Sequence, residues 1–403
     1  MSLHDPRGPH GAGAFDLLAP TPEHALLADT LREFVAREVE PQAGVHDREE
    51  RFNHALFQSA GQLGLLGVMI PEEYGGAGLD AVAAVQVCEA LSTADPGFAL
   101  SVLAHAILFA HNVSVNGTEQ QQKHVLPRSV SGEWIGGLCM TEPEVGTDVL
   151  SLRTTARRDG DVYRLNGCKT FITNGGLEDG STGDCFIVYA ATAPGVISSF
   201  LVEKGMPGFR LGQKWTDKLG MRASFTAELV FEDVPVPVAS RMGEEGEGTL
   251  HMMRNLEIER LTLAAMSLGI AQRCLQVMVD YAGQRQAFGK PIREFGQIQR
   301  HVTESFAEWR AARTFVYDVA RRMDVRGKGQ RIDADATKLF ASQMAKRAAD
   351  AAIQVLGGYG YMGEYVVQRL WRDAKLIEIG GGTLEAHHKN LMKELARNPQ
   401  VLR

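Results

Sequence analysis

A glutamate within a long apolar stretch is the first residue whose position suggests chemistry. Residues 249–286 repeat apolar side chains near helical spacing on two flanks, which predicts a central helix more than ~50 Å long. Glu257 has a cation at both three-residue offsets, whereas Glu259 has none among its neighbours three and four positions away, Asn255, Leu256, Thr262 and Leu263. Desolvation raises the pKa of a carboxylate in apolar surroundings, which suits a general base or acid. The alternative is a Glu259 that points to solvent or meets an arginine from another helix.

Other patterns that often carry chemistry are excluded or weak. Residues 76–81 fit GxGxxA and residues 358–363 fit GxGxxG, but neither lies between a strand and a helix as a dinucleotide fingerprint requires. The sequence contains no P-loop and no GxSxG motif. Adjacent His387 and His388 would face different sides of a helix, so we interpret them as polar helix surface and predict no metal site.

Composition limits the protein class. The chain has 403 residues, 44% hydrophobic and 23% charged, with a net charge of −7, which is typical of a soluble protein of two or three domains. The acidic balance argues against nucleic acid as a partner, and the apolar runs are too short to predict a membrane span. Five scattered cysteines indicate reduced thiols and a cytoplasmic location.

The elements that would position Glu259 follow the order α, β, α. We predict a disordered start at 1–20, a helical domain at 21–134, a β domain at 135–245 and a helical domain at 246–403. Thr21 and Pro22 are expected to begin the first helix and Pro41 to end it. The other predicted helices are 57–66, 81–91, 99–111, 118–125, 307–322, 336–356 and 384–396. The predicted strands are 135–140, 154–156, 162–166, 168–173, 185–191, 198–202 and 227–231, with a hairpin turn at Asp159-Gly160.

Four sequence blocks, taken in order on this background, resemble the acyl-CoA dehydrogenase family. They are LCMTEPEVGTD at 138–148, LNGCKTFITNG at 165–175, RQAFG at 285–289, and QVLGGYG at 354–360 followed by RDAK at 372–375. The resemblance implies an α+β fold with an N-terminal helical domain, a middle β-barrel or β-sheet domain and a C-terminal four-helix bundle. It also implies FAD as cofactor, an acyl-CoA substrate, electron-transfer flavoprotein as partner and a homotetramer built as a dimer of dimers.

The resemblance assigns ligand contacts to residues of these blocks. The implied FAD contacts are Leu138, Met140, Thr141, Gly146, Thr147, Phe171, Ile172, Thr173, Arg285, Phe288, Gln354, Gly357, Gly358, Thr383 and Glu385. The implied substrate contacts are Thr147, Glu257, Arg260, Leu263, Gly380, Gly381 and Gly382. An aromatic residue gives a flavin a flat apolar surface, and an arginine beside glycines suits the diphosphate, here of a partner subunit's FAD.

The sequence departs from the family pattern at the catalytic base. Many members carry a glutamate where this chain has Gly381, and a glycine cannot accept a proton. The isovaleryl-CoA dehydrogenase-like subgroup places the base on the long helix, in a Glu-Arg-Leu context that matches Glu259-Arg260-Leu261. Glu378 and Glu385 are the competing candidates. We hypothesise that Gly381 keeps a backbone N–H for the thioester carbonyl while Glu259 takes the proton.

The expected reaction is α,β-desaturation of an acyl-CoA to a trans-2-enoyl-CoA. Gly380 stands where the family pattern has a bulky tyrosine, and together with Leu263 it favours a short branched acyl group such as isovaleryl. An acyl-CoA oxidase that uses O₂ and a non-enzymatic flavin-binding scaffold are the alternatives.

Overall fold

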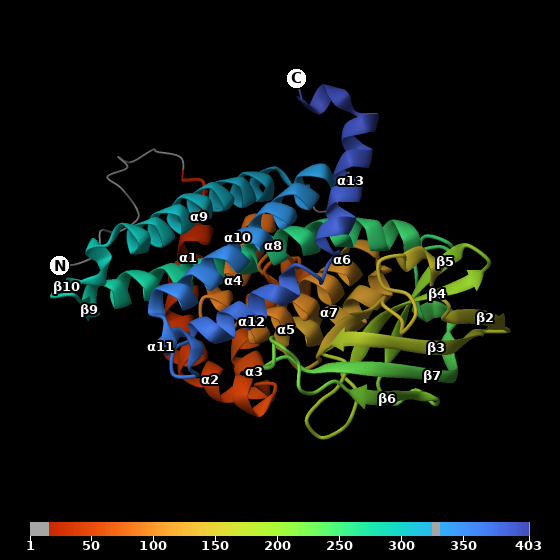
Figure 1. Ribbon diagram of the computed structural model, residues 1–403. Helices are drawn as coiled ribbons and strands as arrows, with labels where there is room; N and C mark the ends of the chain where they lie inside the picture. The colour runs from red at the N-terminus through yellow and green to blue at the C-terminus, as the bar shows by residue number, and fades with distance from the viewer. Residues whose placement is uncertain (1–15, 325–330, 403) are drawn as a thin grey trace.

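The computed structural model describes residues 16–324 and 331–402, so most of the segment predicted to be disordered, 1–20, lies outside the described residues. The described chain runs from helices through a sheet and back to helices, with the sheet at one end of the molecule and the long C-terminal helices along the other (Figure 1). The predicted α+β order is confirmed.

The N-terminal helices begin as the sequence predicts. Thr21 caps the first helix by accepting a hydrogen bond from the N–H of His24, and Pro22 takes the first helical position. The helices are α1 (Pro22–Phe34), α2 (Glu40–Glu49), α3 (His54–Gln62), α4 (Ala81–Ser92), α5 (Pro96–Leu103), α6 (Asn112–Asn116) and α7 (Glu119–Ser131).

The prediction that Pro41 ends the first helix is wrong. A π-helical turn, Val35–Val39, joins α1 to α2, and Pro41 falls in the first turn of α2. The wider turn changes the hydrogen-bond register, so the missing N–H of proline is tolerated as it is at any helix start. The chain leaves α2 at Glu50, which has a left-handed backbone with φ 49°.

Two helical stretches, Pro96–Asn116 and Gly248–Gln284, are long and apolar enough to cross a membrane by length and composition alone. Their most apolar windows are 83% and 72% buried inside the fold, respectively, as expected for helices of a protein core. Gly269, in the second of these helices, lets α4 approach closely, since a Cβ there would lie 2.1 Å from the carbonyl oxygen of Glu89.

The middle of the chain forms an eight-stranded sheet in the order β6-β7-β3-β2-β4-β5-β8, with β1 parallel to β4. The hairpin between β2 and β3 turns at Gly160, as predicted. The segments predicted as strands 162–166 and 168–173 form one strand, β3, and β6 was not predicted. The strands are β1 (Gly136–Cys139), β2 (Thr155–Asp159), β3 (Val162–Thr173), β4 (Cys185–Ala193), β5 (Val196–Glu203), β6 (Phe209–Lys214), β7 (Thr226–Pro237) and β8 (Arg241–Met242).

The C-terminal region packs four long helices together and adds a fifth that projects from the body (Figure 1). The packed helices are α8 (Gly248–Gln284), α9 (Gly296–Arg322), α10 (Arg331–Leu356) and α12 (Val367–Ile377), and the projecting helix is α13 (Leu384–Arg397). The sequence did not predict α12. A short hairpin, β9 (Gln286–Ala287) and β10 (Lys290–Pro291), follows α8, and the short helix α11 (Gly358–Tyr361) follows α10.

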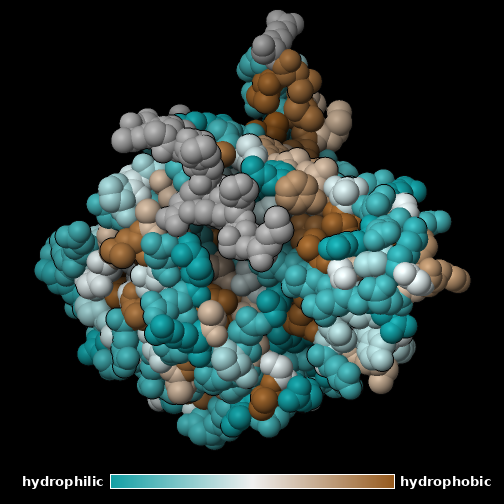
Figure 2. Space-filling view, turned by 90° about the vertical axis from the view of Figure 1, so that its left-hand side faces the viewer, coloured by the Kyte–Doolittle hydropathy of each residue, from teal (hydrophilic) through white to brown (hydrophobic). Residues whose placement is uncertain are grey.

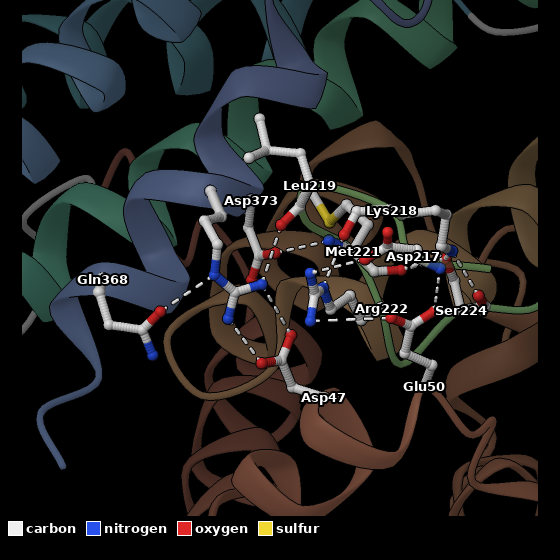
Figure 3. Close-up of polar contacts among 11 residues, drawn as sticks. Asp47, Glu50, Asp217, Lys218, Leu219, Met221, Arg222, Ser224, Gln368 and Asp373 are labelled. Carbon is white, nitrogen blue, oxygen red and sulfur yellow. Dashed lines mark hydrogen bonds and ion pairs between the residues drawn. The ribbon is translucent and has the colours of Figure 1, made fainter. Parts of the chain in front are cut away.

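All three regions meet at the RDAK block (Figure 3). The guanidinium of Arg372 on α12 pairs with Asp47 of α2 at 2.6 Å and donates to the carbonyl oxygen of Leu219 at 3.0 Å. Asp373 accepts the N–H of Met221 at 2.6 Å, and burial raises the pKa of Asp373 to about 7. Gly220 touches the backbone of α12, because a Cβ there would lie 2.5 Å from the carbonyl carbon of Arg372. These contacts hold α12 in place relative to the sheet, and with it the glycine turn at residues 380–382 that follows this helix.

Candidate active site

Glu259 lies in the buried middle of α8. Its side chain is surrounded by the core, with 9% of the residue exposed. Burial raises the pKa of Glu259 to about 7, and the charges of Arg260 and Lys338 oppose the shift. The raised pKa is the electrostatic property predicted from the residue's apolar neighbours. A carboxyl that titrates near neutral pH is suited to take a proton and release it again.

A turn of glycines faces Glu259 from between α12 and α13. Gly381 and Gly382 have φ angles of +66° and +107°, which glycine adopts without strain. A Cβ built on Gly381 would lie 3.4 Å from Oε1 of Glu259 and 2.4 Å from Cδ1 of Leu263. The structure therefore places Glu259 at the position where the sequence lacks a glutamate side chain, and Leu263 closes the remaining space.

The glycine turn presents unpaired backbone donors at this place. Within residues 16–324 and 331–402, the N–H groups of Gly381 and Gly382 donate to no protein acceptor, whereas the N–H of Gly380 donates to Leu376 at 2.8 Å. Unpaired backbone N–H groups beside a buried carboxylate can stabilise an oxygen that gains negative charge. This arrangement combines a proton acceptor with an oxyanion donor within one small space.

A buried polar network supports the turn, and the sequence did not predict it. Arg260 pairs with Asp335 of α10 at 3.2 Å, and its Nε donates to the carbonyl oxygen of Gly381 at 3.4 Å. Asp335 also binds Nδ1 of His387 on α13. The interpretation of His387 as polar helix surface is wrong, since the residue is fully buried, whereas His388 is exposed. Adjacent helix positions face different sides, and only one of them faces the core.

The competing carboxylates are less suited to act as the base. Glu378 forms an ion pair with Lys375 at 2.7 Å. Glu385 is exposed at the start of α13, where backbone hydrogen bonding lowers its pKa. Of the other predicted substrate contacts, Glu257 is partly exposed one turn before Arg260. A Cβ on Gly380 would make only ordinary van der Waals contact, 3.6 Å from the carbonyl oxygen of Leu376.

A second group of predicted residues meets at the edge of the sheet. The N–H of Thr170 donates to the carbonyl oxygen of Thr141 at 2.9 Å, which brings the segment after β1 beside β3. Leu138, Met140 and Thr141 are partly exposed there, together with Thr173. Gly146 and Thr147 are exposed in the following loop. The side chain of Ile172 packs in the sheet core, so only its backbone is available to a ligand.

Phe171 is presented on this edge in an unusual conformation. A β-bulge between Lys169 and Ile172 gives Phe171 a φ angle of +57°, and 62% of the residue is exposed. Its ring lies 5.3 Å from that of Trp215. A left-handed backbone at an exposed aromatic residue costs ~1 kcal/mol or more, and bulges often direct side chains into functional sites. The result is an exposed apolar ring on the same edge of the sheet as Thr141 and Thr173.

A buried ion pair holds this edge in place. The Nζ atom of Lys169 lies 2.8 Å from Oε1 of Glu142, and the same Nζ donates to the carbonyl oxygen of Met140. The carboxylate of Glu142 also accepts the N–H groups of Arg153 and Thr154. With these bonds satisfied, the segment that carries Thr141 is fixed to β3.

A third group of predicted residues lies at the far end of α8. Arg285, Gly357 and Gly358 line a hollow of about 590 Å³ together with Tyr281 and Tyr359. Phe288 is almost fully exposed in the β9–β10 turn, and Gln354 is exposed on α10. At 1.5 Å per helical residue, Arg285 is about 39 Å from Glu259 along α8. The structure thus separates this group from the glycine turn.

Comparison with known proteins identifies this arrangement. Family models described as the N-terminal, middle and C-terminal domains of acyl-CoA dehydrogenase match residues 21–133, 137–234 and 246–396. The chain belongs to the acyl-CoA dehydrogenase family. It is 41% identical to an isovaleryl-CoA dehydrogenase of Oryza sativa, covering 91% of this chain and 90% of that protein. The protein is an acyl-CoA dehydrogenase, an oxidoreductase.

Two solved structures extend the comparison. Butyryl-CoA dehydrogenase from Megasphaera elsdenii superposes with a TM-score of 0.89 and 35% identity, covering 96% of this chain and 100% of that one. An acyl-CoA dehydrogenase from Bacillus anthracis complexed with FAD has a TM-score of 0.87 and 32% identity, covering 94% of this chain and 68% of that one. FAD is the cofactor of this acyl-CoA dehydrogenase.

The residues of the sheet edge fit this cofactor. The exposed ring of Phe171 suits one face of an isoalloxazine, and Thr141 and Thr173 supply hydroxyl groups beside it. Arg285 with the Gly357-Gly358 turn suits a diphosphate, because guanidinium and closely approaching backbone both bind phosphate oxygens. The contacts of individual residues with FAD stay predictions.

Proposed function

We propose that this acyl-CoA dehydrogenase desaturates a short branched acyl-CoA, such as isovaleryl-CoA, with Glu259 as the catalytic base. The adjacency of Glu259 to Gly381 carries the proposal, because it puts a carboxylate of raised pKa beside unpaired backbone N–H groups. The ionised carboxylate takes the proton from the α-carbon of the thioester, so the rate rises as the pH passes the pKa of Glu259.

The chain's other residues bind and orient the thioester. The N–H of Gly381 donates to the thioester carbonyl, which stabilises the enolate-like charge as the α-proton leaves. FAD, when bound, would supply the hydride acceptor for the β-carbon, which would leave a trans double bond between the α- and β-carbons. The missing side chain at Gly380 and the side chain of Leu263 shape the acyl site for a short branched group. The similarity to the rice isovaleryl-CoA dehydrogenase supports this substrate class.

The partner proposals rest on exposed surfaces. Separation of the Arg285 hollow from Glu259 by about 39 Å suits an FAD bound by two subunits, each supplying one end of its site. Helix α13 projects from the body and carries an apolar side that Figure 2 shows in brown, with Met392, Val401 and Leu402 exposed along the projection. We therefore propose a homotetramer, and membership of the acyl-CoA dehydrogenase family supports electron-transfer flavoprotein as the proposed electron acceptor.

A comparison of two glutamate variants tests the base. Glu259→Gln should bind FAD normally and lose flavin bleaching by isovaleryl-CoA under anaerobic conditions by ~10³-fold or more. Glu378→Gln is the matched control, because it removes a neighbouring carboxylate that already pairs with Lys375. Bleaching of Glu259→Gln at the wild-type rate would exclude Glu259 as the base.

A screen of substrates and electron acceptors tests the proposed substrate class and the proposed electron acceptor. Bleaching rates across straight and branched acyl-CoA thioesters should be highest for short branched chains. Reduced enzyme should be reoxidised by electron-transfer flavoprotein much faster than by air, whereas faster reoxidation by air would favour an acyl-CoA oxidase. A purified protein that carries and binds no flavin would favour a scaffold.

A further inference from the structure

Lys338 is a fully buried lysine on α10, next to the active site but without a role in the reaction described so far. Its Nζ donates to the carbonyl oxygen of Gly382. Burial lowers the pKa of Lys338 to about 7, and the charge of Glu259 opposes that shift. A buried lysine is costly to the fold unless its hydrogen bonds and charge are matched, so its position calls for a function or a strong structural reason.

Lys338 acts on the glycine turn together with Arg260. Arg260 donates to the carbonyl oxygen of Gly381 and Lys338 to that of the next residue, so two cations from different helices bind consecutive carbonyls. Glycines with positive φ have wide conformational freedom, and two charged donors restrict it. Since each peptide unit is planar, fixing the carbonyl of Gly381 also fixes the direction of the Gly382 N–H.

The two cations differ in what else they contact. The guanidinium of Arg260 is also paired with Asp335, which in turn binds His387, so the charge of Arg260 is shared with an acid. Among the described residues, Lys338 has no ion pair within 4 Å, and Glu259 is the carboxylate that affects it most. Arg260 and Lys338 both favour the ionised form of Glu259, Arg260 the more strongly, but Lys338 is the one whose charge is not paired with an acid.

We propose that Lys338 is a positioning residue, which holds the Gly381–Gly382 backbone in its active shape and, when protonated, adds to the charge of Arg260 in favouring the ionised form of Glu259. The proposal rests on the assignment of Glu259 as the base. It assigns to α10 a direct part in setting the pH range in which the enzyme works.

The charges around Glu259 determine in which direction its pKa changes when Lys338 is replaced. Arg260 on its own helix and Lys338 on α10 lower its pKa, against the effect of burial. The acidic groups nearby are Asp335 on α10 and Glu378 at the end of α12, and both act on Lys338. His387 on α13 is paired with Asp335, and Tyr189 on β4 is neutral at working pH because burial raises its pKa. Removing the charge of Lys338 therefore raises the pKa of Glu259.

Lys338→Met tests the proposal, with Lys338→Arg as the conservative variant. The measured quantity is the rate of anaerobic flavin bleaching by saturating isovaleryl-CoA from pH 5.5 to 9. In Lys338→Met the apparent pKa should rise by about one unit, and the limiting rate at high pH should fall ~10-fold or more, with substrate affinity changed less than about threefold. In Lys338→Arg the fixed charge should keep the apparent pKa at or below the wild-type value.

A lysine elsewhere on α10 provides the matched control. Lys346 lies over the ring of Trp371, and Lys346→Met removes the same number of side-chain atoms and the same charge from the same helix. Its pH profile should match that of the wild type. If Lys338→Met does not retain FAD, the apparent pKa of the bleaching rate in Lys338→Arg tests the proposal instead. An apparent pKa above that of the wild type overturns the proposal.

The outcomes separate this proposal from the assignment of the base. A wild-type pH profile and rate for Lys338→Met, with Glu259→Gln inactive, would overturn the role of Lys338 and leave Glu259 as the base. Normal bleaching by Glu259→Gln would instead remove the base itself. A rate loss in Lys338→Met without a change in apparent pKa would contradict the electrostatic part of the proposal.

Discussion

The carboxylate of Glu259 lies directly against the place where a side chain on Gly381 would begin. A Cβ at position 381 would lie 3.4 Å from Oε1 of Glu259 and 2.4 Å from Cδ1 of Leu263. The two positions are 122 residues apart in sequence, yet they adjoin in space. With Glu259 as the proposed base, the long helix would supply the carboxylate that position 381 lacks, and a glycine at 381 leaves room for Leu263 beside it.

Gly381→Ala should therefore be damaging, although alanine is the smallest change. The new methyl group collides with Leu263, and φ +66° strains any residue with a Cβ. We expect a loss of ~2–4 kcal/mol in unfolding free energy and at least ~10-fold slower bleaching. Gly380→Ala is the control for stability, because its Cβ would meet nothing closer than 3.6 Å. A Gly381→Ala enzyme as stable and active as the wild type would contradict the close packing of this turn.

The buried acid at 259 should also make stability depend on pH. Its pKa is about 7 in the folded protein, compared with an ordinary value of 4.5, so the folded state binds the proton more tightly than the unfolded state. Stability from this group is then complete below about pH 4.5 and decreases as the pH rises to about 7. Glu259→Gln removes this dependence and should be more stable than the wild type by up to about 3 kcal/mol at pH 8. Denaturant unfolding at several pH values measures the difference, and an equal stability at pH 8 would contradict it.

The sequence was sufficient to predict the apolar surroundings and raised pKa of Glu259, but not the polar network around it. Glu259 could be recognised from local spacing, because the offsets of three and four residues on a helix determine its near neighbours. Lys338, Asp335 and His387 come from α10 and α13, and their contacts depend on helix packing over long sequence separations. His387 was misassigned for this reason, since adjacent histidines give no sign of which one faces the core.

The same limit applies to the fold. Regular periodicity predicted α4, α8 and most strands, whereas Pro41 was misinterpreted because a π-helical turn resets the register before it. The sequence showed the RDAK block only as a family feature. The structure explains that block as the junction of three regions, where Arg372 contacts both Asp47 and the backbone of Leu219 (Figure 3).

Arg372→Met should destabilise the protein through this junction. The substitution leaves Asp47, of which 8% of the side chain is exposed, without the guanidinium that neutralises it. We expect a loss of ~2–4 kcal/mol in unfolding free energy, because breaking a buried pair leaves a buried charge unpaired. Arg347→Met is the matched control, since its pair with Glu308 is exposed and should contribute less than ~1 kcal/mol. Equal effects of the two substitutions in denaturant unfolding would show that the junction is not important for stability.

Phe171 should behave as a ligand contact and not as part of the core. Its backbone is strained at φ +57° and 62% of the residue is exposed, so Phe171→Gly removes strain and little buried surface. The flavin-free variant should be as stable as the wild type or up to ~1 kcal/mol more stable, while FAD binding weakens ~10-fold or more through loss of the flat apolar contact.

Phe186 gives the comparison for this prediction, because it is an aromatic residue of the same sheet that is wholly buried in its core. Phe186→Ala should cost ~3–5 kcal/mol of unfolding free energy in the flavin-free protein. Denaturant unfolding of the flavin-free proteins and titration with FAD measure the two effects separately. If Phe171→Gly lost as much stability as Phe186→Ala, the bulge in β3 would serve packing, and the flavin would have to bind against another surface.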